Sequence, residues 1–131
     1  MHGVDAQRAF TLLEALIALL VLSVGLLGMA SLQLESLRGA HLGYQRGLAS
    51  LAAQDAVELL WSRLEAGGCP RLGAAEAAWQ DRWQEHLPGL QGEVSALGGG
   101  CRYRIRLEWS GAAREAATTL VYRARLPEVS P

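Results

Sequence analysis

The chain has 131 residues, a formal net charge of −1 and two cysteines, and half of its residues are hydrophobic. This length allows one small domain and one long apolar segment. The near-zero net charge gives no bulk field that would favour nucleic acid or an anionic membrane surface, so a nucleic-acid partner is disfavoured.

The N-terminal region combines a short polar stretch with a long uncharged one. Residues 1–9 show no structural pattern, and the stretch Ala15–Leu34 has no charged residue. At about 1.5 Å per residue, such a run crosses the roughly 30 Å of hydrocarbon in a bilayer. A secretory signal has a shorter apolar core and a small-residue cleavage site after it, neither of which fits here. We therefore predict a membrane-spanning helix.

Glu14 immediately precedes this apolar run. A carboxylate deep in a membrane costs roughly 2.5–3.5 kcal/mol, and intramembrane carboxylates therefore have a partner and a purpose. We interpret Glu14 as a functional residue. The alternative is a carboxylate that lies at the lipid headgroups, solvated and without a role.

The helix is expected to continue beyond the membrane. No proline occurs between Phe10 and Glu65, and Gly67-Gly68 followed by Cys69-Pro70 forms a stop signal. The pattern predicts one helix of about 55 residues, with a transmembrane half at 10–34 and an amphipathic half at 35–66. Its expected apolar stripe consists of Leu37, Tyr44, Leu48, Leu51, Val57, Leu60 and Leu64.

Residues 67–131 are expected to form a small globular head. A short amphipathic helix is predicted within 73–88, where Trp79 and Trp83 share a face. Packing of both rings against the long helix is favoured over a carbohydrate platform. Cys101–Trp109 alternates strictly and predicts a strand, followed by a second at Thr118–Leu126. Because two strands alone are marginal, a third is expected around Glu93–Leu97.

The predicted strands place their apolar faces on the long helix and five arginines on the other face. These are Arg102, Arg104, Arg106, Arg123 and Arg125. Such a face could contact DNA phosphates or acidic residues of a neighbouring protein. It could also be a solvated surface that limits aggregation. The sequence leaves the three alternatives open.

Both cysteines, Cys69 and Cys101, follow the apolar segment. If this part of the chain lies outside the cytoplasm, a disulfide is the default expectation, with free thiols as the alternative. Closing that loop contributes roughly 3–4 kcal/mol in the chain-entropy model. Neither cysteine has a second ligand at metal spacing, so no metal site is predicted. The sequence also lacks a nucleophile–base pattern and a phosphate loop, so we predict no enzyme activity and no cofactor.

The stretch Phe10-Thr-Leu-Leu-Glu14 before an uncharged run resembles the N-terminus of type IV prepilins. The continuation Ser23-Val-Gly-Leu-Leu-Gly28, and an aromatic strand ending in Trp109-Ser-Gly, are similar to the PilV family of minor pilins, the type IV pilus modification proteins. The resemblance implies a pilin-like α+β fold and a leader at residues 1–9. It also implies cleavage between Ala9 and Phe10 by the prepilin peptidase, with N-methylation at Phe10. Prepilins normally have Gly before the cut, and Ala9 is similarly small.

The resemblance further implies a minor pilin that primes or caps type IV pilus assembly. Such a protein starts as a single-pass inner-membrane protein with a cytoplasmic N-terminus and a periplasmic head, and later enters the pilus at the cell surface. Its partners would be other minor and major pilins and the inner-membrane assembly platform. Glu14 would pair with the α-amine that cleavage creates on an adjacent subunit. The alternatives are a minor pseudopilin of a type II secretion system, a DNA-binding competence-type minor pilin, and an uncut membrane-anchored protein.

Overall fold

The computed structural model describes residues 2–65, 68–111 and 116–130, with only the backbone described for residues 2–7. The elements follow the order α1 (His2–Ser62), α2 (Ala74–Gln84), β1 (Gln91–Leu97), β2 (Arg102–Trp109) and β3 (Thr118–Arg125). The chain forms two compact units, Met1–Leu42 and Gly43–Pro131, and α1 contributes to both. The long helix is thus confirmed.

Both ends of α1 differ from the sequence prediction. The helix begins at His2, inside the stretch in which no pattern was expected. No proline interrupts residues 2–9, and a helix already nucleated downstream extends at little cost. At its other end α1 stops at Ser62, a few residues before the glycine pair that was expected to end it.

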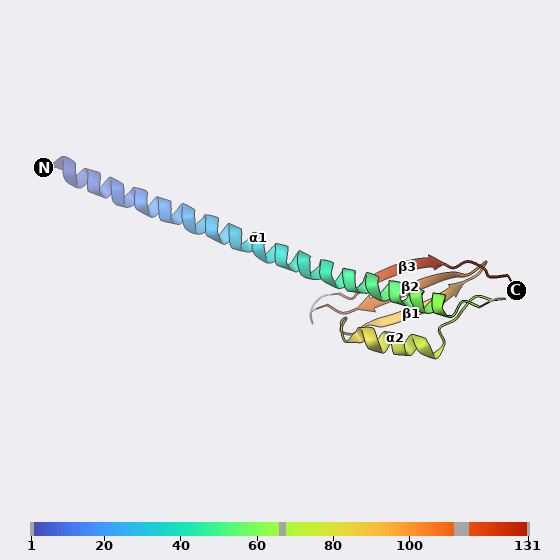
Figure 1. The fold of residues 1–131 in the computed structure, drawn as a ribbon. Helices are drawn as coiled ribbons and strands as arrows, with labels where there is room; N and C mark the ends of the chain where they lie inside the picture. The colour runs from blue at the N-terminus through green and yellow to red at the C-terminus, as the bar shows by residue number, and fades with distance from the viewer. Residues whose placement is uncertain (1, 66–67, 112–115, 131) are drawn as a thin grey trace. The chain divides into compact units, whose positions relative to one another are not determined.

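The head is an antiparallel sheet covered on one face by the C-terminal part of α1 (Figure 1). The strand order is β1-β2-β3, and both pairings run without a break from Gln91↔Glu108 to Leu97↔Arg102 and from Arg102↔Arg125 to Trp109↔Thr118. Helix α2 lies beside β1. The fold is therefore a long N-terminal helix packed on a three-stranded antiparallel sheet, the predicted pilin-like α+β architecture.

The face of α1 that packs on the sheet matches the predicted stripe only in part. Leu60 is fully buried, and Leu48, Val57 and Leu64 are partly buried against the core. Tyr44 and Leu51 are 66% and 52% exposed. The fully buried residues of α1 are Ala49, Ala52, Ala53, Ala56 and Leu60, of which the predicted stripe contained only Leu60. They follow the i, i+3, i+4, i+7 spacing of one helix face. Small helix residues complement the large side chains opposite them in the same core, which include Trp79, Trp109, Ile105 and Leu107.

This complementarity predicts that Ala53 does not tolerate a larger side chain. Ala53→Leu is expected to lower the free energy of unfolding by about 1–3 kcal/mol, because extra methylene groups in a packed core displace their neighbours. Thermal unfolding of the full chain in detergent measures the effect. Gln54→Leu, at the adjacent exposed position, is the matched control and should change little. Equal melting temperatures for both variants would contradict the packing described.

Both tryptophans of α2 contact α1, which confirms the packing interpretation over the carbohydrate platform. The Trp79 ring is fully buried, and its Nε1 donates to the carbonyl oxygen of Ala52 at 3.0 Å. Trp83 Nε1 donates to Asp55 Oδ2 at 2.8 Å, and Arg82 pairs with the same carboxylate oxygen at 3.3 Å. These contacts fix α2 against the long helix.

Candidate assembly site and interaction face

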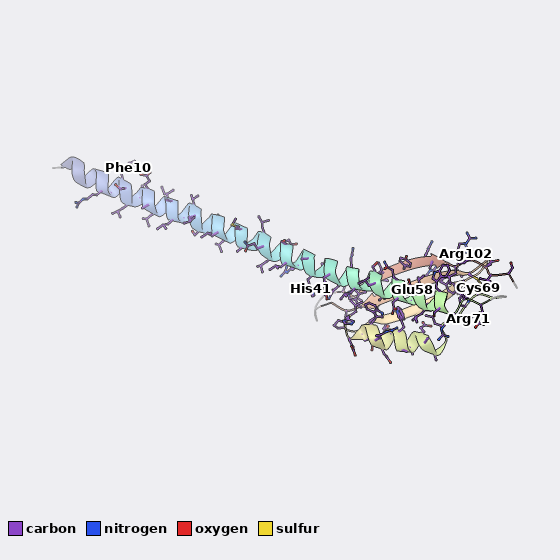
Figure 2. The ribbon with its side chains drawn as sticks, viewed as in Figure 1. Phe10, His41, Glu58, Cys69, Arg71 and Arg102 are labelled. Carbon is purple, nitrogen blue, oxygen red and sulfur yellow. A yellow bond between two sulfur atoms is a disulfide. The ribbon has the colours of Figure 1, made fainter. Side chains whose placement is uncertain are left out.

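The N-terminal part of α1 exposes its apolar side chains all round the helix (Figure 2). The exposed fraction of the large apolar side chains in this run extends from 53% at Ile17 to 74% at Phe10. Within the described residues, α1 is the one helix long and apolar enough to cross a membrane. A surface of this kind requires lipid or other apolar helices around it.

Phe10 and Glu14 are four residues apart on this helix and therefore share a face. Both are exposed, and no ion pair within the described part of the chain involves Glu14. Its own chain thus supplies no opposite charge among the described residues. A carboxylate within the membrane is expected to have an opposite charge nearby, whereas one solvated at the headgroups needs none.

The two serines of the run form hydrogen bonds within the helix. The hydroxyl of Ser23 donates to the carbonyl oxygen of Leu20 at 2.9 Å, and that of Ser31 donates to Leu27 at 3.0 Å. Such local bonds let serine lie in an apolar environment at low cost. Glu14 differs from these two serines, because no ion pair in the described part of the chain involves its carboxylate.

Residues 5–30 match the family model described as the prokaryotic N-terminal methylation motif. The matched segment is the N-terminal motif of type IV pilins and pseudopilins, and it covers only the first part of the chain. No curated protein and no solved structure gave a significant match to it.

This motif is characteristic of pilin-type structural subunits and not of enzymes. The motif implies that the prepilin peptidase processes the chain and that the chain assembles with other pilins. The apolar helix and the motif are consistent with residence in the inner membrane and then in a filament. The cut between Ala9 and Phe10, the methylation at Phe10 and the role of Glu14 are developed below as proposals.

The head is closed by the predicted disulfide. Cys69 and Cys101 are joined, with a sequence separation of 32. Next to this bond, the hydroxyl of Tyr103 donates to the carbonyl oxygen of Pro70. Burial raises the pKa of Tyr103, with the Arg71 guanidinium opposing, so the hydroxyl keeps the proton that it donates. Two adjacent links thus hold the segment after α1 to the start of β2.

The five predicted arginines lie on one face of the sheet, but they form two groups. Arg106 pairs with Glu108 at 3.2 Å and lies directly opposite Glu93 of β1. The other four form two directly opposed cross-strand pairs, Arg102↔Arg125 and Arg104↔Arg123. We call these four residues the arginine quartet. The positive charge is therefore confined to one end of the sheet.

The sequence analysis did not identify two residues of α2 whose side chains accept hydrogen bonds from the backbone of β1. Glu76 Oε1 accepts a hydrogen bond from the backbone N–H of Val94, and Gln80 Oε1 accepts one from Gly92, both at 3.0 Å. Their spacing of four residues is a helical signal, but nothing in the sequence indicates which strand the helix would lie beside. Together they cover the outer edge of β1.

Proposed function

We propose that this protein is a minor pilin of the PilV type, a structural subunit that primes or caps a type IV pilus. The observation that carries the proposal is the position of Glu14. It lies four residues after Phe10, at the start of the exposed apolar part of α1 and inside the methylation motif. A small disulfide-closed head on such a helix is suited to assembly rather than to turnover.

The proposed sequence of events starts with the prepilin peptidase. It cuts between Ala9 and Phe10 and methylates the new amine of Phe10. This α-amine has an unperturbed pKa near 8 and is mostly protonated at neutral pH. In the low dielectric of the membrane, the amine on one subunit and Glu14 on its neighbour attract each other strongly. Entry into the filament then depends on both processing and axial register.

A minor pseudopilin of a type II secretion system would use the same N-terminal chemistry. The similarity of Ser23–Gly28 to the PilV family favours the pilus. A DNA-capturing competence pilin is less well supported, because Glu93 and Glu108 share the sheet face with the arginines. A polyanion following that face would meet these carboxylates.

A deletion strain tests the proposal. We expect it to lose most surface filaments while type II secretion continues, and we expect the complemented strain to recover them. Purified filaments should contain the mature chain at far less than one copy per major subunit. Normal filament numbers combined with failed secretion would contradict the pilus assignment and support the pseudopilin.

A further inference from the structure

The two edge strands of the head sheet, β1 and β3, differ in the hydrogen bonds that their outer edges make. On β1, side chains of α2 accept hydrogen bonds from the outward-facing N–H groups of Gly92 and Val94. On β3, no hydrogen bond reaches the outer edge from any residue that the structure describes. Unpaired N–H and C=O groups along a strand edge form a template for another strand.

The ladder fixes which groups of β3 point outward. The N–H of Leu126 donates to the carbonyl oxygen of Cys101 at 2.8 Å. In an antiparallel pair, residues bonded to the partner alternate with residues that face away. Counting back along the register, Leu120, Tyr122 and Ala124 are bonded to β2. The N–H and C=O groups of Thr119, Val121, Arg123 and Arg125 therefore face outward.

The edge of β3 has the form that a strand-addition site requires. It is eight residues long, contains no proline, and pairs with β2 without a bulge. Its inward-facing residues, Leu120 and Tyr122, are only partly buried, whereas Ile105 and Leu107 opposite them on β2 are fully buried. The core at this side of the sheet is thus incompletely covered.

The charges of the arginine quartet indicate which side chains an added strand would carry. The arginine quartet places like charges directly opposite each other, which costs stability. None of its members has an ion pair within the described part of the chain. A strand beside β3 with acidic side chains at alternate positions would place them next to Arg123 and Arg125. Its remaining side chains would cover Leu120 and Tyr122.

We propose that the β3 edge binds an extended segment of a different protein, in which acidic and apolar residues alternate. A second copy of this chain is a poor occupant, because β3 itself carries two arginines and no acidic residue. The proposal is independent of leader processing and of Glu14. It would hold for a pilus or a pseudopilus.

Binding of a synthetic peptide to the full chain in detergent micelles tests the proposal. The peptide is Glu-Val-Glu-Thr-Glu-Val-Glu with both ends blocked, followed by fluorescence anisotropy. In an antiparallel addition, the N–H groups of its Glu residues bond to β3. N-methylation of the Glu amides should therefore weaken binding at least tenfold. N-methylation of the Val and Thr amides, the matched control, should change it less than threefold.

Two protein variants distinguish the contribution of the arginine quartet to peptide binding from that of the other arginine on the same face, Arg106. Arg123→Ser should weaken binding about fivefold, whereas Arg106→Ser should change it less than twofold, because Glu108 already neutralises Arg106. Hydrogen exchange should slow at the amides of Thr119, Val121 and Arg123 when the peptide binds. Amides of Leu120 and Tyr122, already bonded to β2, should change little.

Equal effects of the two methylations would overturn the proposal, as would unchanged exchange at Val121 with peptide bound. Tighter binding of a 20-base-pair duplex, weakened equally by Arg106→Ser and Arg123→Ser, would overturn it as well. That result would assign the face to nucleic acid.

Discussion

Glu14→Ala should reduce the amount of this protein in purified filaments at least tenfold. The proposed attraction between the carboxylate and the α-amine of an adjacent subunit is lost, and the amine remains in the membrane without its partner. Removing one member of a buried ion pair costs about 3–5 kcal/mol. Partial solvation at the membrane surface reduces that figure, so tenfold is the lower bound that we expect. Quantitative immunoblots of sheared filaments measure it.

The experiment must distinguish a defect of Glu14→Ala in filament assembly from a defect in leader cleavage or in folding. The variant is expected to be cut normally, and intact mass of the membrane pool shows whether it is. Glu35→Ala removes a carboxylate just beyond the other end of the same apolar run and serves as the matched control, with near-normal incorporation. Normal incorporation of processed Glu14→Ala would remove the proposed role of the carboxylate.

Cys69→Ser should lower the free energy of unfolding of the head by roughly 3–4 kcal/mol. The disulfide closes a loop over a sequence separation of 32, and its loss restores that loop's freedom to the unfolded chain. Cys69 is exposed, so the serine adds no buried hydroxyl, whereas Cys101 is 2% exposed and would be the poorer choice. Urea unfolding of the detergent-solubilised chain gives the difference.

Reduction of the wild-type protein provides the control for this experiment. Dithiothreitol should shift the wild type to the unfolding midpoint of Cys69→Ser and leave the variant unchanged. The hydrogen bond from Tyr103 to Pro70 persists in both forms, so the head should still fold. A reduced wild type as stable as the oxidised one would show that the loop constraint contributes nothing.

The sequence predicted the elements well where the hydrophobic period was strong. The alternation from Cys101 to Trp109 predicted β2. The third strand, expected around Glu93–Leu97, is β1. The pairing of Cys69 with Cys101 was predicted because there were only two cysteines. The helical spacing of Trp79 and Trp83 also indicated their common contact with α1.

The packing face of α1 was predicted only in part, through Leu48, Val57, Leu60 and Leu64. Large apolar residues such as Tyr44 and Leu51 dominate a hydrophobic pattern, and the buried face consists mainly of alanines. Their burial follows from the bulk of Trp79 and Trp109, which lie far away in sequence. The division of the arginines had a similar cause in part, because the position of Glu93 opposite Arg106 depends on strand register. The register of the strands and the hydrogen bond from Gly92 to Gln80 at the β1 edge both depend on tertiary structure, which the sequence pattern does not specify.

Intact-mass and N-terminal analysis of the protein from native membranes is the most direct test of pilin processing. Cells with the prepilin peptidase should contain a chain that starts at Phe10, lacks residues 1–9 and carries one added methyl group. Cells without the peptidase should contain only the uncut form. A chain that still begins at Met1 in peptidase-positive cells would contradict the proposed cleavage and the pairing of Glu14 with a new amine.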